Sequence, residues 1–209
     1  MRLAIFGASG GTGLQLTRLA LERGHNVRAL VRSQKGVSAL PNGVRVVLGS
    51  ALDYESVNKT VLGVEAVLSC LGQNTLLRNT RVCSAGTHLI MDVMKAHGVR
   101  RLVVMSAFGA GESVALASLM QKLIFSTLLA APYEDKNLME PDVKASGLEW
   151  TIVRPGLLGN SPRTDRYRVA SGIRIPGMVS VPRADVAAAM LRAVEERLWI
   201  GEAPTVTMT

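Results

Sequence analysis

The stretch RLAIFGASGGTG at residues 2–13 decides the fold. It begins with the apolar run Arg2–Phe6, which is typical of a strand buried on both faces, and continues with three glycines spaced three residues apart. A helical pattern then runs from about Thr12 to Arg23, and Gly24 is placed to end it. A strand, a glycine-rich turn and a helix in this order predict the first unit of a parallel sheet with crossover helices.

Each glycine of this turn has its own physical role. Gly7 permits a sharp turn, Gly10 lets the backbone approach a pyrophosphate, and Gly13 lets the helix pack closely on the strand. The N-terminus of the helix adds free amides and the positive end of the helix dipole. In this context we interpret the turn as a dinucleotide site, and not as a purely structural glycine turn. The other contacts expected from it are Ser9, Gly11 and Thr12.

The end of the second expected strand indicates which dinucleotide binds. A site for NAD places a carboxylate about 20 residues beyond the glycine motif, whereas a site for NADP places a cation there. The chain reads ALVRSQKG at residues 29–36, where Arg32 can bind a 2′-phosphate, Ser33 can add a hydroxyl and Lys35 can add charge. The predicted cofactor is therefore NADP(H). The alternative is that Arg32 is an ordinary surface arginine.

Short apolar runs alternate with longer segments of helical period along the rest of the chain. This alternation predicts an α/β fold, a doubly wound (Rossmann) parallel sheet with helices on both faces. We expect one domain over residues 1–209 with a small C-terminal substrate lid, the substrate-side elements lying mainly in 107–182. Further strands are expected at Asn26–Val31, Val44–Leu48, Ala66–Cys70, Arg101–Met105 and Trp150–Val153, and further helices at Asn79–His97, Val114–Ala130, Asp135–Ala145 and Ala184–Leu198.

Composition indicates an ordinary folded protein, with 48% hydrophobic and 19% charged residues. The apolar run at the start stops at Gly7, too short for a signal peptide, so we expect a cytoplasmic protein. The apolar stretch 114–132 contains Gln121 and Lys122, which favours an amphipathic or pocket-covering helix over a membrane span. Cys70 and Cys83 are too few for a disulfide framework and lack metal-ligand spacing, so no metal site is expected.

The formal net charge of +8 comes from basic residues that are scattered and not gathered in one run. Nucleic acid is therefore not an expected partner. A small anionic or conjugated substrate fits better, and the chain is expected to act as a monomer or a small homo-oligomer. Four late arginines could meet such an anion or could equally form a solvated basic face, namely Arg163, Arg166, Arg168 and Arg174.

Taken together, these residues resemble the atypical short-chain dehydrogenase/reductase family, in the NAD(P)H-binding group that contains biliverdin reductase B, also called flavin reductase. The resemblance covers nearly the whole chain. Its matching segments are GASGGTG at Gly7, LVRS at Leu30, GSALD at Gly49, CLGQN at Cys70, MKAHGV at Met94, SAF at Ser106, SGLEWTIVRPG at Ser146 and PRADVAAAMLRA at Pro182.

The resemblance assigns roles to residues at the carboxyl ends of expected strands, where a doubly wound sheet opens its binding crevice. It implies that Ser50 and Ala51 flank the adenine and that Ser106 lies beside the nicotinamide. It also implies that Leu71 and Gly72 line the cofactor. Pro155 belongs to a loop expected to shape the pocket, and Lys136 matches the family's catalytic lysine by its ten-residue spacing to Ser146.

The chain departs from the family at three positions. Ser50 replaces an acidic residue, and Leu157 replaces a histidine of the substrate loop. The position of the catalytic tyrosine, four residues before Lys136, holds Pro132, and Tyr133 is one residue out of register. On a helix that offset of about 100° predicts a phenol aimed away from the shared site.

These residues predict an NADPH-dependent reductase that transfers hydride from the nicotinamide to a flat conjugated acceptor, such as a flavin or a biliverdin-like molecule. Ser106 and Lys136 are the candidate catalytic residues. Such an acceptor spreads the charge it receives, so solvent can supply the proton and no tyrosine is required. The alternative is a non-catalytic NADP-binding regulator or partner protein.

Overall fold

The structure of the chain is a computed structural model that describes residues 1–72 and 81–209. Its first unit consists of β1 (Arg2–Phe6), the glycine turn and α1 (Gly11–Glu22). The other strands are β2 (Asn26–Val31), β3 (Arg45–Leu48), β4 (Ala66–Ser69), β5 (Arg101–Met105), β6 (Glu149–Pro155), β7 (Leu157–Gly159), β8 (Tyr167–Ala170), β9 (Ser180–Pro182) and β10 (Thr205–Met208). The other helices are α2 (Gln34–Ser38), α3 (Tyr54–Val61), α4 (Val82–Ala96), the 3₁₀ helix η1 (Gly111–Leu116), α5 (Leu119–Ser126), α6 (Ala130–Ala145) and α7 (Arg183–Glu195).

The main sheet has the strand order β3-β2-β1-β4-β5-β6-β10-β8. All neighbouring pairs are parallel except β10 and β8, which are antiparallel. A second, small sheet pairs β7 with β9 in parallel. The strand order reverses between β1 and β4, so the crevice of the sheet opens at the carboxyl ends of these two strands. The predicted doubly wound fold is confirmed.

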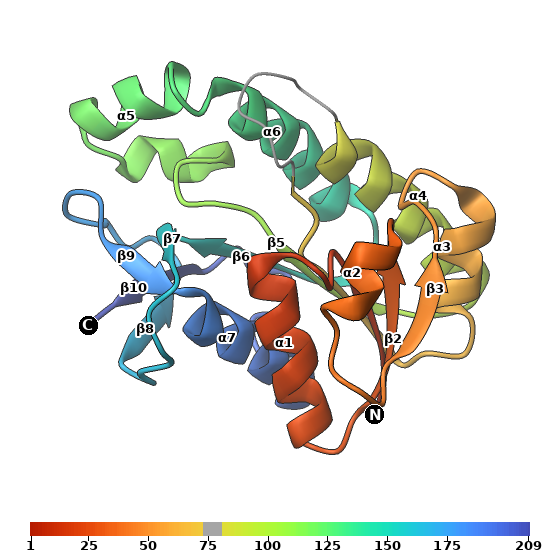
Figure 1. The fold of residues 1–209 in the computed structure, drawn as a ribbon. Helices are drawn as coiled ribbons and strands as arrows, with labels where there is room; N and C mark the ends of the chain where they lie inside the picture. The colour runs from red at the N-terminus through yellow and green to blue at the C-terminus, as the bar shows by residue number, and fades with distance from the viewer. Residues whose placement is uncertain (73–80) are drawn as a thin grey trace.

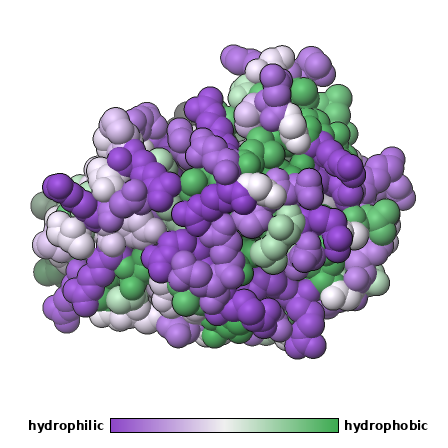
Figure 2. Space-filling model, turned by 90° about the horizontal axis from the view of Figure 1, so that it is seen from below, coloured by the Kyte–Doolittle hydropathy of each residue, from purple (hydrophilic) through white to green (hydrophobic). Residues whose placement is uncertain are grey.

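Two apolar layers hold the helices against the sheet. In β1, Leu3 and Ile5 belong to the layer beneath α1 and α7, whereas Ala4 and Phe6 belong to the layer beneath α3, α4 and α6. This division follows from the alternation of side chains along a strand. Figure 1 shows α1 and α7 on one side of the sheet and α4 and α6 on the other. From below, the surface is mainly hydrophilic with smaller hydrophobic areas (Figure 2).

The region after β5 differs from its prediction. The single helix expected at 114–130 is η1 followed by α5, because Ser118 and Gln121 form a capping box that begins a new helix. Helix α6 begins at Ala130 and not at Asp135, since Pro132 lies in its first turn, where a proline costs no hydrogen bond. No helix within 1–72 and 81–209 is both long and apolar enough to cross a membrane.

Elements built from short or polar segments were not predicted at all. They are α2, α3, β7, β8, β9 and β10. The expected start of a helix at Asn79 and the motif residues Gln73 and Asn74 lie outside the described residues.

Candidate functional site

A cavity of about 270 Å³ opens at the carboxyl ends of β1 and β4, where the strand order reverses. We call it the cofactor pocket. It is lined by Gly7, Ser9, Gly10, Gly11, Thr12, Gly13, Leu30, Arg32, Ala51, Cys70, Leu71, Gly72, Val82, Met105, Leu158 and Arg183.

Close packing explains why the turn after β1 is built from glycines. A Cβ atom on Gly13 would lie 2.1 Å from the Gly7 carbonyl oxygen, so any larger residue would push α1 away from the strand. Gly7 has a φ of +72°, and a Cβ on it would lie 2.5 Å from the Cys70 carbonyl oxygen. The Gly10 amide donates to the Gly7 carbonyl at 3.0 Å, which closes the turn. The roles predicted for Gly7 and Gly13 therefore agree with the geometry.

The N-terminus of α1 has the properties of an anion site. Its N-cap residue, Gly10, has no side chain that could cap it, and its first turn holds no acidic residue. Thr12 is 3% exposed and lines the cofactor pocket, yet its buried Oγ1 has no hydrogen-bond partner among the described residues. Free amides, the helix dipole and an unpaired hydroxyl together fit the phosphates of a dinucleotide. Arg32, at the end of β2, adds an exposed cation to the same wall.

Most of the predicted cofactor contacts meet in this pocket, but four of them do not line it. The Ser33 hydroxyl accepts a hydrogen bond from the Gly36 amide at 3.3 Å and caps α2. The Ser50 hydroxyl accepts one from the Leu52 amide at 3.2 Å. Pro155 is buried at the end of β6, and Ser106 follows Met105 at the end of β5. The roles of these four residues stay predictions.

The two candidate catalytic residues come from different elements, Ser106 from the end of β5 and Lys136 from α6. Ser106 is buried, and its hydroxyl has no partner among the described residues, while its amide donates to the Val153 carbonyl at 2.7 Å. Lys136 is half-buried on α6. Burial raises the pKa of the Cys70 thiol to about 12, and the nearby Lys136 ammonium opposes that rise. Lys136 therefore acts electrostatically on Cys70, which lines the cofactor pocket.

A second cavity, of about 360 Å³, adjoins the first, and we call it the apolar pocket. The Phe125 and Tyr133 rings stack in its wall with centroids 4.7 Å apart, and Phe108 meets Phe125 edge-on at 6.5 Å. Most of its lining is hydrophobic, and Arg183 is the only charged residue among the described residues that line it. The lining consists of Phe108, Gln121, Phe125, Leu129, Tyr133, Gly156, Leu157, Leu158, Ile175, Gly177, Met178, Val179 and Arg183.

Tyr133 lines the apolar pocket and is not part of the described lining of the cofactor pocket, so the prediction that its phenol is aimed away from the site shared with Lys136 stays a prediction. Its ring lines the apolar pocket, because this pocket extends toward α5, on the side of α6 that Tyr133 faces. The phenol donates a hydrogen bond to the Phe108 carbonyl at 2.7 Å, and burial raises its pKa. The proton of the phenol is thus already engaged with the backbone.

Sequence reasoning missed Arg183, which together with Leu158 lines both pockets. Arg183 is the first residue of α7, and its Nη1 donates to Asn160 Oδ1 at 2.6 Å and to the Leu158 carbonyl at 3.4 Å. The signal for it in the sequence is the segment PRAD at 182–185, which carries the family resemblance but no recognised cofactor motif.

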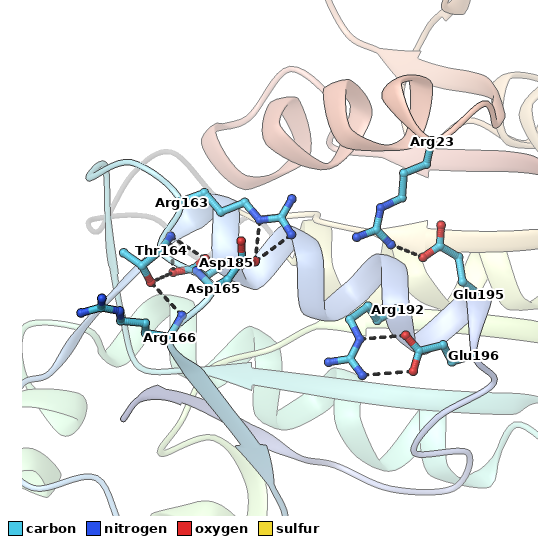
Figure 3. A network of polar contacts seen from close by, with 9 residues as sticks. All are labelled: Arg23, Arg163, Thr164, Asp165, Arg166, Asp185, Arg192, Glu195 and Glu196. Atoms are coloured by element: carbon cyan, nitrogen blue, oxygen red, sulfur yellow. Dashed lines mark hydrogen bonds and ion pairs between the residues drawn. The ribbon is translucent and has the colours of Figure 1, made fainter.

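A buried carboxylate anchors the loop beside Arg183. Asp185 accepts hydrogen bonds from the Thr164 hydroxyl at 2.6 Å and from the Thr164 and Asp165 amides at 3.0 Å (Figure 3). Arg163 pairs with Asp165 in the same loop. None of the four late arginines is among the described residues that line either pocket, so the suggestion that they form one anion site in these pockets is not supported.

The sequence model of a family described as NAD(P)H-binding matches residues 7–197. The chain belongs to this NAD(P)H-binding family, with the fold of the atypical short-chain dehydrogenases/reductases. The match confirms the predicted cofactor, NADP(H), whereas a preference over NADH stays a prediction.

Individual proteins and solved structures are also similar to this chain. Sterol demethylase protein B of Methylococcus capsulatus is 32% identical over 76% of this chain, which spans 52% of that protein's length. A structure titled as ChuY, an anaerobillin reductase of Escherichia coli O157:H7, superposes with a TM-score of 0.84 at 22% identity, covering 100% of this chain and 97% of the other. A short-chain dehydrogenase/reductase of Veillonella parvula, solved in complex with NADP, superposes with a TM-score of 0.82 at 19% identity, covering 99% and 94%.

Proposed function

We propose that this chain is an NADPH-dependent reductase that transfers hydride from the nicotinamide to a flat conjugated acceptor, such as a flavin or a biliverdin-like molecule, in the cytoplasm. The observation that carries the proposal is the apolar pocket, which is walled by aromatic rings and shares Leu158 and Arg183 with the cofactor pocket. A site of this kind places an apolar ring system next to a bound dinucleotide and excludes water from both.

The residues around the two pockets have separable tasks in such a reaction. Bound NADPH supplies the hydride. The glycine turn and Arg32 hold the dinucleotide, and the unpaired Ser106 hydroxyl is available to the nicotinamide or to the acceptor. Lys136 is available to a ribose hydroxyl from α6. Segment 107–182 contributes most of the apolar pocket and acts as the substrate side of the molecule.

The state of Tyr133 favours a conjugated acceptor over a simple ketone. Reduction of an isolated carbonyl gains from a positioned acid, but the Tyr133 proton is bonded to the Phe108 carbonyl. A flavin or bilin delocalises the charge and takes its proton from solvent. The names of two relatives, an anaerobillin reductase and a 3-diazoavenalumate denitrifying reductase, also describe reductases.

The test is to follow NADPH oxidation with a panel of flavins, quinones and biliverdin, each with a control without protein. We expect turnover with at least one flat conjugated acceptor and none with simple aliphatic ketones. Oxidation of NADPH by ketones alone would contradict the proposed acceptor class.

The second candidate function is a non-catalytic NADP-binding regulator or partner protein. The observation that favours it is that no free phenol lines either pocket among the described residues, since Pro132 occupies the tyrosine position and the Tyr133 hydroxyl is engaged. Tight NADPH binding without turnover on any acceptor of the panel would support this function.

A further inference from the structure

Arg183 lies against the N-terminus of α1, although α1 is the first helix of the chain and α7 the last. A Cβ atom on Gly11, the first residue of α1, would lie 2.7 Å from both Cδ and Nε of Arg183. Arg183 therefore packs directly against the glycine turn, and both belong to the lining of the cofactor pocket. This contact brings a cation from the C-terminal part of the chain onto the motif at its start.

The guanidinium is held in place by uncharged groups. Its Nη1 donates to Asn160 Oδ1 and to the Leu158 carbonyl, both acceptors without a formal charge. No carboxylate within 1–72 and 81–209 pairs with it, whereas the nearby Arg163 pairs with Asp165. Arg183 thus keeps its positive charge available to a ligand in the pocket.

Two independent features of the same place also favour an anion. The N-terminus of α1 is uncapped, and the buried Thr12 Oγ1 at the pocket wall has no partner among the described residues. A dinucleotide places its pyrophosphate over the glycine turn at a helix N-terminus. We propose that Arg183 binds this pyrophosphate and completes the anion site that the glycine turn and Thr12 form.

The proposal separates Arg183 from Arg32 in function. Arg32, at the end of β2, is expected to bind the 2′-phosphate of the adenosine half, whereas Arg183 binds the pyrophosphate that joins the adenosine half to the nicotinamide half. The ligand 2′-AMP carries the adenine and the 2′-phosphate but no pyrophosphate. Comparing it with NADP⁺ therefore distinguishes the contributions of the two arginines.

The experiment measures dissociation constants of NADP⁺ and 2′-AMP by calorimetry for wild type, Arg183→Met, Arg183→Lys and Arg32→Ala. Arg163→Met is the matched control, because it removes a neighbouring arginine that lines neither pocket. We expect Arg183→Met to raise the dissociation constant of NADP⁺ at least tenfold and that of 2′-AMP less than twofold. The dissociation constants of Arg183→Lys should lie between those of Arg183→Met and the wild type. Arg32→Ala should weaken both ligands, and Arg163→Met neither.

Two results would overturn the proposal. One is NADP⁺ binding by a folded Arg183→Met protein within twofold of wild type, which would leave Arg183 to an anionic group of the acceptor. The other is an equal loss of NADP⁺ and 2′-AMP affinity, which would indicate a general disturbance of the pocket. Circular dichroism and the thermal midpoint show whether each variant is folded. Because these measurements involve no turnover, they remain valid if the chain proves to be non-catalytic.

Discussion

At the scale of single residues, two candidate site residues carry a buried polar atom without a partner among the described residues. Within the described residues, five buried side-chain polar atoms lack a hydrogen-bond partner, and two of them belong to Thr12 and Ser106. Leaving such an atom unpaired costs about 1–3 kcal/mol, which a ligand can recover. The sequence predicted both residues, Thr12 from the glycine motif and Ser106 from the family resemblance. It could not predict Arg183, because only the folded chain brings α7 against α1.

Arg32 is expected to select the phosphorylated cofactor. Losing a charge-assisted hydrogen bond costs about 1.5–3 kcal/mol, so Arg32→Ala should weaken NADPH by about 10- to 100-fold and NADH by less than twofold. Calorimetric titration of both cofactors measures the difference. Arg45→Ala, which removes an exposed arginine at the amino end of β3, is the control. Equal affinities of the wild type for NADPH and NADH would refute the assignment.

Tyr133 is expected to matter little to hydride transfer onto a conjugated acceptor. Tyr133→Phe should leave NADPH-dependent flavin reduction within about threefold of wild type, which is less than 1 kcal/mol of barrier, whereas Ser106→Ala should slow it more. Steady-state rates with saturating NADPH provide the comparison. A hundredfold loss in Tyr133→Phe with normal NADPH binding would restore the phenol as a proton donor.

At the scale of elements, the sequence predicted best those strands that are continuous apolar runs. The bounds of β1, β2 and β5 agree with the sequence, because each is a short apolar run in a sheet covered on both faces. The edge strands β7, β8 and β9 were missed because they are short and partly exposed, and β10, which lies between β6 and β8, was missed because two of its four residues are threonines. The break between η1 and α5 depends on the Ser118 cap, a local signal that the apolar run obscured.

The glycines in the turn between β1 and α1 are expected to differ in how their substitution affects folding and cofactor binding. A Cβ on Gly13 would meet the Gly7 carbonyl oxygen at 2.1 Å, but one on Gly10 would meet it at 3.2 Å. Gly13→Val should therefore lower both the thermal midpoint and NADPH affinity, whereas Gly10→Val should abolish binding in a protein that still folds. Thermal melts and NADPH titrations of the two variants test this. A folded Gly10→Val protein with normal affinity would be inconsistent with the role of Gly10.

A buried ion pair joins β6 to α6 beneath the substrate side. Arg154 pairs with the buried Glu140 and, at 2.9 Å, with the more exposed Glu112, which also accepts from Lys144 at 2.5 Å. Burial raises the pKa of Glu112, but the hydrogen bonds from Arg154 and Lys144 outweigh it and lower the pKa to about 2. The ionised carboxylate is therefore preferred in the folded state.

This lowered pKa makes the contribution of Glu112 depend on pH. The stabilisation is complete above the ordinary value of 4.5 and is lost as the pH falls from 4.5 toward 2. Glu112→Gln should accordingly be less stable than wild type at pH 7, and the difference should vanish near pH 2. Urea denaturation across this range measures it, with the exposed Glu134→Gln as control. A difference that stayed constant with pH would exclude the ionised pair as its source.

At the scale of the whole molecule, the two pockets meet at the carboxyl edge of the sheet. The N-terminal half provides the glycine turn, and the C-terminal half provides all described residues of the apolar pocket, including Arg183. Leu158 and Arg183 form the shared wall, so a nicotinamide held on one side would present one fixed face to an acceptor on the other. Hydride transfer in such a site must distinguish the two hydrogens at C4 of the nicotinamide.

The mass of the NADP⁺ formed from stereospecifically deuterated NADPH tests this account most directly. NADPH labelled with deuterium in the 4R or the 4S position would be oxidised with the best acceptor of the panel. The account predicts that one label is lost completely and the other retained completely, because the site fixes the face of the nicotinamide. Partial retention of both labels, as in reaction free in solution, or no oxidation above the control without protein would contradict it.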